Sequence, residues 1–334
     1  MHAVASKPQW LFTQKTNISL CLGLMFIFSV FTACNDEDKF IPPTSATTNQ
    51  NSNAKFTGTT AVTNSNGRIV NCGSIQAVTE GTTDLQQAAN RLEIPQLKGG
   101  EQNLFIVHTV PTYGINYSME YNLTLRAQHW SAYRWDRTNS GKAVSRTDAW
   151  APDPLIPWEY RTDQEDHSSN GYTRGHIVAS EDRVYSREAN EQTFYYSNMH
   201  PQLYYFNTQG IWWNIENKLI RSQYNTNAFR DTLYVVKGGT IREGEYTKAK
   251  GIPVPKYFYV ALLRKRNDIH VNNGYAAIGF WMEHKNNDDA NYKNYAKSID
   301  ELEQLTGIDF FCNLPDDVER EVEREYSTTV WKLN

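Results

Sequence analysis

The chain has 334 residues, a formal net charge of −4 at pH 7, and 9 Trp, 20 Tyr and 14 Phe. This aromatic content excludes disorder over most of the length, which allows one large domain or two ordinary ones. The charge excludes a protein that is basic throughout, so any binding of nucleic acid would need a local basic groove.

The N-terminus has the pattern of a secretion signal. Lys7 and Lys15 precede an apolar run, Ile18 to Phe31, that is shorter than the ~20 residues of a membrane span. The run ends in Phe-Thr-Ala-Cys at residues 31–34, a small-residue cleavage pattern followed at once by Cys34. It resembles a bacterial lipobox, although Leu normally stands in the leading position. We expect a signal peptide over residues 1–33 and lipidation of Cys34; an ordinary signal peptide and an uncleaved anchor are the alternatives.

The residues after Cys34 indicate location and organisation. Asn35-Asp36-Glu37-Asp38 is an acidic run that resembles signals for display on the outer surface. We therefore expect a protein of the bacterial cell envelope, lipid-anchored to the outer membrane and touching the membrane only through that anchor. Residues 34–66 are rich in Ser, Thr and Asn and predict a flexible tether. Residues 67–334 would form the domain.

Two cysteines remain after processing, Cys72 and Cys312. An oxidising envelope permits them to form a disulfide, but sequence supplies no geometry for the pair. Two isolated buried thiols are the alternative.

The domain is predicted to be α+β, with a mostly antiparallel central sheet and flanking helices. The runs rich in β-branched and aromatic residues predict strands at 103–110, 130–135, 232–238, 257–264 and 276–283. Apolar residues four positions apart predict a helix over 210–224. Ser298-Ile299-Asp300-Glu301 is a capping box that opens a short helix, and 316–326 predicts a charged, exposed C-terminal helix.

The segment Gly171-Tyr172-Thr173-Arg174-Gly175-His176, with Asn207 and Glu216 downstream, carries the most informative chemistry. An imidazole accepts a proton near neutral pH. Amide and carboxylate oxygens suit Mg²⁺, and a guanidinium can hold phosphate through a planar set of donors. The combination predicts metal-assisted cleavage of a phosphodiester.

Thr173-Arg174-Gly175-His176 resembles the Asp-Arg-Gly-His motif of the DNA/RNA non-specific endonucleases, the ββα-metal nucleases that include endonuclease G. Further motifs keep the family's order: residues 177–183, 197–202, 206–207 and 212–216, and upstream the segment 146–154. The resemblance covers roughly residues 90 to 334. It implies a ββα-metal (His-Me finger) active site, in which a strand bears the His and a helix presents Asn and Glu.

The chain departs from the family pattern at three points. Thr173 replaces the usual Asp. The separation between Asn207 and Glu216 is one residue longer than usual, and Arg221 follows Glu216 by one position more than usual. We place the extra residue between Asn207 and Trp212.

The resemblance implies a role for each motif residue. His176 would be the general base, Arg146 would stabilise charge on the phosphate, and Asn207 would be the direct ligand of one Mg²⁺. Glu216 would hold metal-bound water. The alternatives are a structural His, a surface Arg, a helix-cap Asn and a solvated helix Glu.

Other polar residues would support these four. The resemblance implies that Arg174, Arg183 and Arg221 bind substrate phosphates and that Arg174 also acts in catalysis. Thr173 and Asn198 would brace the site by hydrogen bonds. We assign no base-stacking residue, because aromatic side chains beside a helix are usually core.

The sequence thus predicts a Mg²⁺-dependent, sugar-non-specific endonuclease that cleaves DNA and RNA through contacts to the phosphate backbone, with Mn²⁺ able to substitute. One alternative is a surface lipoprotein that binds nucleic acid without cleaving it. A second is an unrelated envelope lipoprotein that binds glycans. Oligomeric state is left open.

Overall fold

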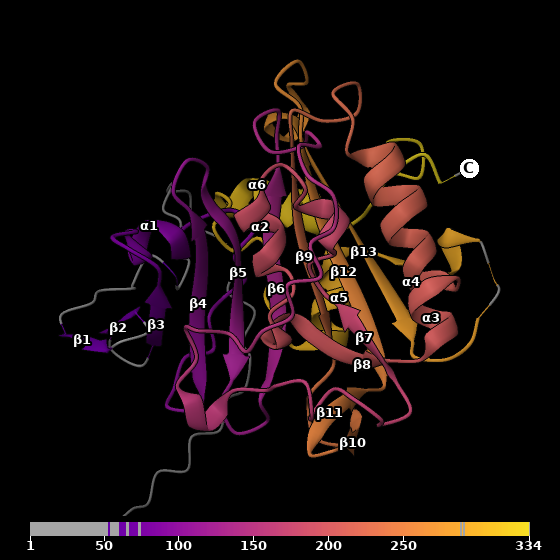
Figure 1. Ribbon diagram of the computed structural model, residues 1–334. Helices are drawn as coiled ribbons and strands as arrows, with labels where there is room; N and C mark the ends of the chain where they lie inside the picture. Colours follow the sequence, from indigo (N-terminus) through magenta and orange to yellow (C-terminus); the bar gives the residue numbers. More distant parts are fainter. Residues whose placement is uncertain are drawn as a thin grey trace, which may run out of the picture. The chain divides into compact units, whose positions relative to one another are not determined.

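A ten-stranded sheet runs through the part of the chain that the computed structural model describes: residues 53, 60–64, 67–72, 75–287, 289 and 291–333. Figure 1 shows the sheet with its helices. Its strands, in spatial order, are β1 (Thr60–Asn64), β2 (Gly67–Cys72), β3 (Ile75–Thr79), β4 (Asn103–Val110), β5 (Gly114–Asn122), β6 (Ala127–Trp135), β9 (Thr232–Gly239), β12 (Tyr257–Lys265), β13 (Tyr275–Glu283) and β14 (Ala296–Lys297).

Neighbouring strands are antiparallel except for the β3–β4 pair, which is parallel. This confirms the predicted α+β class with a mostly antiparallel sheet. The five strands predicted from sequence are confirmed as β4, β6, β9, β12 and β13. β4, β9, β12 and β13 combine β-branched and aromatic residues, and β6 is rich in aromatic residues; both kinds pack well on a pleated surface.

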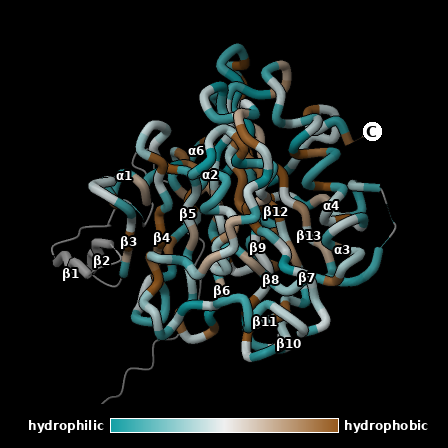
Figure 2. Tube along the Cα trace, viewed as in Figure 1, coloured by the Kyte–Doolittle hydropathy of each residue, from teal (hydrophilic) through white to brown (hydrophobic). Residues whose placement is uncertain are grey.

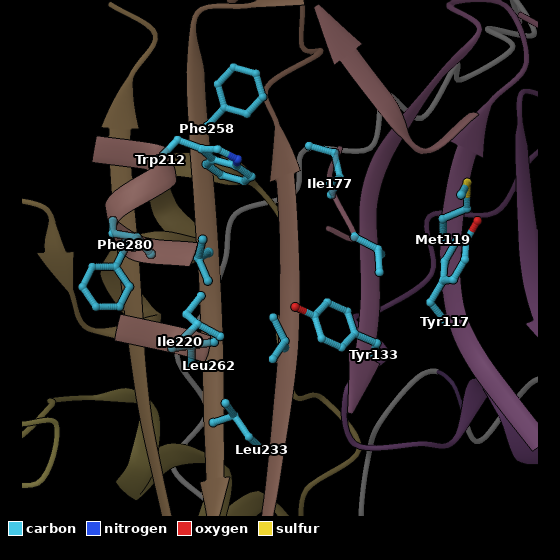
Figure 3. Packing of buried hydrophobic residues seen from close by; sticks show 14 of the residues in the cluster. Tyr117, Met119, Tyr133, Ile177, Trp212, Ile220, Leu233, Phe258, Leu262 and Phe280 are labelled. Carbon is cyan, nitrogen blue, oxygen red and sulfur yellow. The ribbon is translucent and has the colours of Figure 1, made fainter. Parts of the chain in front are cut away.

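From β4 to β13 the sheet is buried on both faces, because these strands contribute to two core clusters. Figure 2 shows apolar residues along these strands. Successive strand residues point to opposite faces, so Val235 and Val236 of β9 belong to two different core clusters. The cluster on the Val235 face includes Tyr133, Ile177, Trp212 and Phe258 (Figure 3). The cluster on the Val236 face contains the apolar residues of the C-terminal helices.

The helices are short. They are α1 (Leu85–Ala89), α2 (Arg187–Gln192), α3 (Tyr204–Thr208), α4 (Ile211–Asn214), a π-helix (Ile215–Tyr224), α5 (Ile299–Thr306) and α6 (Asp316–Glu323). Single 3₁₀ turns occur at Trp158–Tyr160, Ser180–Asp182, Tyr196–Asn198, Val271–Gly274 and Tyr292–Asn294.

The predicted helix over 210–224 is present, but it continues as a π-helix after Asn214. The capping box is confirmed, since Ser298 and Glu301 exchange side-chain to backbone hydrogen bonds at the start of α5. The prediction of an exposed helix over 316–326 is wrong in two respects. The helix ends at Glu323, and Val318 and Val322 are buried against the sheet.

Two small two-stranded sheets lie outside the main sheet. β7 (Thr173–His176) pairs antiparallel with β8 (Met199–Gln202) across a long connection that contains α2, and β10 (Tyr246–Ala249) forms a hairpin with β11 (Ile252–Pro255). β7 carries the His motif, and β8 leads directly into α3 (Figure 1).

The predicted signal peptide, Cys34 and most of the predicted tether lie outside the described residues. The structure describes two parts of the predicted tether, Asn53 and β1, and both belong to the folded domain. The Asn53 side chain is buried and donates to the Pro95 carbonyl at 3.0 Å. None of the helices in the described ranges has the length and apolar character of a membrane span.

Cys312 is a buried free thiol. Its Sγ lies 3.6 Å from the carbonyl oxygen of Ile94, and burial raises the pKa of the thiol far above its usual range. The side chain of Cys72 lies outside the described residues. The structure therefore shows the second of the two alternatives, an isolated thiol, at Cys312.

Candidate active site

The His motif lies where β7 passes very close to β8. A Cβ atom on Gly175 would come within 2.2 Å of the Gln202 side chain, and Gln202 is fully buried. Glycine is therefore required at residue 175 by the closeness of the two strands. Arg174 and His176, on either side of the glycine, lie on the same face of the β7–β8 pair.

Asn207 comes from α3, which follows β8. Its Nδ2 donates to the Thr173 hydroxyl at 3.0 Å, and that hydroxyl donates to the Gln202 carbonyl at 2.9 Å. The amide group is thus held by β7 through its nitrogen, which leaves Oδ1 as its available oxygen. Asn207 lies inside α3 rather than at a helix cap.

The helix is interrupted between α3 and α4, within the interval where we placed the extra residue. Gln209 has φ −147° and ψ −26°, outside the helical region, and Gly210 begins the next helix. Two helices therefore replace the single helix that we expected to present both residues. The break allows Asn207 and Glu216 to be oriented independently.

Most of the predicted catalytic residues line one pocket of about 400 Å³. His176, Arg146, Arg174 and Asn207 line it, although they come from four positions spread over the chain. The other lining residues were not assigned a role from sequence: Trp150, Thr208 and Trp213.

The His176 imidazole is neutral at physiological pH. Burial lowers its pKa, and Arg146, Lys237 and Arg174 lower it further, to about 3. Its Nε2 is buried and has no hydrogen-bond partner among the described residues. The ring packs edge-on against Phe194, with a centroid distance of 5.0 Å.

Two guanidinium groups flank the imidazole. The Arg146 side chain donates to Asp148 Oδ1 at 2.8 Å and to Ser180 Oγ at 2.9 Å. Arg174 stacks over the Trp150 ring, with its Cζ 3.9 Å from the ring centroid. These contacts hold two positive charges at the pocket, in a chain whose net charge is negative.

Glu216 does not line the pocket. It is buried, and its Oε1 accepts a hydrogen bond of 2.7 Å from Lys237, whose side chain is fully buried on β9. Burial raises the pKa of Glu216, with Lys237 acting in the opposite direction. The other carboxylate oxygen hydrogen-bonds no group in the described chain, and the side chain is 8% exposed.

Asp182 completes this charged cluster. It accepts hydrogen bonds from Arg221 at 2.7 Å and from the Tyr133 hydroxyl at 2.5 Å, and its Oδ2 lies 3.5 Å from Lys237 Nζ. Burial favours the protonated acid, but Arg221 and Lys237 outweigh it and hold the pKa of Asp182 below its usual range. Arg221 is thus bound to Asp182 and does not line the pocket.

Arg183 is fully buried. Its Cζ lies 4.1 Å from the centroid of the Tyr133 ring, and its Nη2 donates to the Arg134 carbonyl. A guanidinium enclosed by rings cannot reach a phosphate, so our assignment of Arg183 to substrate binding is corrected. The structure likewise gives Arg221 a role in a buried ion pair.

Buried polar residues connect the motifs. Asn198 donates to the carbonyl oxygens of Val178 and Thr193 and accepts from the Val178 amide. Asn190 accepts from the Thr147 amide at 2.9 Å and donates to the Ser180 carbonyl at 2.7 Å. Asn190 thereby holds the Arg146 segment in place, a role that no sequence signal indicated.

Asp153, in the same upstream segment as Arg146, is also held by hydrogen bonds. The His108 ring lies 3.1 Å from Asp153 and 2.9 Å from Glu80, and Ser197 donates to Asp153 at 2.5 Å. Burial alone would lower the pKa of His108, but the two carboxylates outweigh it and raise the pKa to about 10. A charged imidazole therefore links this segment to the sheet.

Comparisons with known proteins identify the family of the chain. Residues 102–317 match the family described as DNA/RNA non-specific endonuclease. A nuclease of Nostoc sp. is 28% identical over 76% of this chain and 93% of its own length. The mitochondrial nuclease EXOG of Xenopus laevis is 30% identical over 61% of this chain, which spans 58% of that protein.

A solved structure gives the same fold. The endonuclease in the crystal structure of the EndoG/EndoGI complex matches with a TM-score of 0.51 and 21% identity, covering 59% of this chain and 84% of that one. The family match spans most of the chain, including every motif that lines the pocket. The chain belongs to the DNA/RNA non-specific endonuclease family and is a nuclease.

Proposed function

We propose that this nuclease hydrolyses phosphodiester bonds of both DNA and RNA with the help of one Mg²⁺ ion, which Mn²⁺ can replace. The observation that carries the proposal is the pocket itself, in which His176, Arg146, Arg174 and Asn207 meet around a space of about 400 Å³. A neutral base, two guanidinium groups and one amide oxygen are the groups that such a reaction needs.

The residues present fit a single hydrated magnesium ion. Asn207 Oδ1 would be its direct protein ligand, because the amide nitrogen is bound to Thr173. Mg²⁺ keeps much of its water and is held by few protein oxygens, so one amide suffices when phosphate oxygens complete the shell. Glu216 accepts a hydrogen bond from Lys237 at Oε1, and its other carboxylate oxygen would hold a water of that ion. When bound, the ion stabilises negative charge on the phosphate and the leaving oxygen.

His176 would accept the proton of the attacking water. The water oxygen bonds to phosphorus, the bond from phosphorus to the leaving oxygen breaks, and the proton passes to the imidazole. Since Nε2 is buried, we assign the acceptor role to Nδ1. The low pKa of the ring keeps that nitrogen unprotonated before the reaction.

Arg146 would stabilise the charge that grows on the phosphate in the transition state. Its hydrogen bonds to Asp148 and Ser180 orient the guanidinium before substrate arrives. Arg174, stacked on Trp150, would bind a phosphate of the backbone. Contacts to phosphates read neither base nor sugar, which supports cleavage of both nucleic acids.

The location remains a proposal from sequence. We propose a cell-envelope protein that is lipid-anchored through Cys34 to the outer membrane, with the nuclease domain displayed at the surface. Substrate would then be nucleic acid outside the cell. Radiolabelled palmitate incorporation in cells tests the anchor, and a Cys34→Ala variant that keeps the label would refute it.

The two alternatives are weaker. Membership of the nuclease family excludes an unrelated glycan-binding fold. The sequence argument for binding without cleavage was the presence of Thr173 and the longer Asn207-to-Glu216 spacing. Against it, the Thr173 hydroxyl accepts a hydrogen bond from Asn207, and the helix is interrupted at Gln209, within the longer interval.

Digestion of plasmid DNA and of RNA by the purified protein tests the proposed function. We expect both to be cleaved at millimolar Mg²⁺ or Mn²⁺ and protected by EDTA. Retention of intact nucleic acid on the protein would instead indicate the binding-only alternative. Cleavage that persists in EDTA would remove the metal from the proposal.

A further inference from the structure

Three carboxylates converge where α5 and α6 pack together. Asp300 and Glu303 lie on α5, and Glu323 lies at the end of α6. One oxygen from each lies within 4.8 Å of the other two, a spacing at which three oxygens can contact one cation. Asp300 is accessible to solvent, so an ion could reach the cluster.

This cluster is separate from the nuclease pocket. Leu302 of α5 and Val322 of α6 belong to the core cluster on the Val236 face of the sheet. Trp212, next to the pocket residue Trp213, belongs to the cluster on the Val235 face. The sheet lies between the two sites.

Glu323 is the residue whose surroundings indicate a bound ligand. It is 5% exposed, and its Oε1 has no hydrogen-bond partner among the described residues. A buried carboxylate without a partner is costly, so it requires either a proton or a cation. Its position at the C-terminal end of α6 adds the negative end of the helix dipole.

The protein supplies little positive charge to this cluster. Across the described chain, no Lys or Arg forms an ion pair with Glu303 or Glu323. Burial raises the pKa of Asp300; Arg324 is the cation that acts to lower it, and it forms an ion pair with Glu321 at 3.2 Å. The Phe310 amide donates to Glu303 at 2.7 Å, which satisfies only one oxygen.

Two further acids surround the cluster. Burial, followed by repulsion from Asp309 and Asp300, raises the pKa of Glu303 to about 8. Burial, followed by repulsion from Glu303 and Glu319, raises the pKa of Glu323 to about 11. Without a cation these two carboxyls therefore keep a proton at neutral pH, and a bound cation would take the place of that proton.

We propose that Asp300, Glu303 and Glu323 form a calcium-binding site that links α5 to α6. An all-carboxylate set favours a hard cation. Ca²⁺ accepts several carboxylates in flexible geometry, whereas Mg²⁺ usually takes one or two and keeps its water. Sites of this type in extracellular proteins bind Ca²⁺ with dissociation constants of about 10⁻⁴ to 10⁻³ M.

Calorimetric titration with CaCl₂ tests the site. The parent is the full protein carrying Asn207→Ala, so that binding at the nuclease pocket does not interfere. We expect one Ca²⁺ per chain. Glu323→Gln should weaken binding at least about 10-fold because it removes the buried carboxylate ligand. Asp317→Asn, an exposed change on the same helix, should leave the affinity unchanged.

Thermal unfolding gives a second readout. Ca²⁺ should raise the Tm of the parent by a few degrees, and it should have no such effect on Glu323→Gln. In EDTA the parent and Glu323→Gln should melt within about two degrees of each other, because Glu323 is then protonated and carries no charge. If Glu323→Gln does not fold, Asp300→Asn at the accessible ligand replaces it.

Two results would overturn the proposal. One is equal Ca²⁺ affinity in the parent and in the variant of the cluster. The other is a folded parent that takes up no Ca²⁺ at millimolar concentration, in which case Glu303 and Glu323 share a proton instead. Neither result bears on nuclease activity, which the pocket on the other sheet face carries.

Discussion

Asn207 and Thr173 are joined by a hydrogen bond of 3.0 Å from the Asn207 amide nitrogen to the Thr173 hydroxyl. Thr173 stands where the family usually has Asp. The bond shows what the residue at this position can do without a carboxylate: it holds the amide by its nitrogen and leaves the oxygen free for the proposed metal.

Thr173→Val removes the acceptor of this bond at nearly constant volume. We expect the apparent affinity for Mg²⁺ to fall by about 10- to 100-fold, because residues that orient a metal ligand typically have effects of that size. Activity should recover at high Mg²⁺. Thr173→Ser keeps the hydroxyl and is the control, and an unchanged Mg²⁺ titration in the Val variant would refute the role.

His176 should remain unprotonated across the usual assay range. A pKa lowered to about 3 means that the folded protein binds fewer protons than the unfolded chain below about pH 6.5. Its contribution to stability is therefore complete above that pH and is lost as the pH falls toward 3. We expect no inflection near pH 6.5 in kcat/KM, which reports the free enzyme.

Replacing the imidazole should abolish most activity. His176→Ala is expected to lower kcat by about 10²- to 10⁴-fold, the usual loss for a general base. Far-ultraviolet circular dichroism checks that the variant is folded. Near-normal turnover by the folded variant would exclude His176 as the base.

Arg146→Ala should lower kcat by about 10²- to 10³-fold with a smaller effect on KM, since the charge it stabilises is largest in the transition state. Steady-state kinetics on one defined oligonucleotide separates the two constants. Arg320→Ala, on the opposite side of the sheet, is the control. A change confined to KM would make Arg146 a simple binding residue.

Lys237→Met should destabilise the fold by about 3–5 kcal/mol, because it leaves Glu216 and Asp182 buried without their shared cation. Urea unfolding measures the change. The double variant Lys237→Met/Glu216→Gln should recover part of that loss, since one uncompensated charge is gone. Simple additivity of the two single variants would contradict the coupling.

The sequence was sufficient to predict five strands of the ten-stranded sheet and four of the residues that line the pocket. β4, with the sequence NLFIVHTV, was predicted with its observed bounds because it is rich in β-branched and aromatic residues, which suit a strand. His176 and Asn207 were identified because their neighbours form recognisable motifs. Their meeting in one pocket required coordinates.

Three features could not be read from the sequence because they depend on distant packing. Arg183 looks like a surface cation, yet Tyr133 of β6 and Tyr185 enclose it. Lys237 stands near the end of an apolar strand, where nothing local predicts its pairing with Glu216. The continuation of α4 as a π-helix likewise depends on how it packs against the sheet.

The dependence of turnover on Mg²⁺ concentration in Asn207→Ala tests the proposed metal site most directly. We predict that the variant needs far more Mg²⁺ than the wild-type protein to reach half of its maximal rate, because its direct protein ligand is gone. A Mg²⁺ titration curve that coincides with that of the wild-type protein would contradict the assignment of the metal to Asn207 and to this pocket.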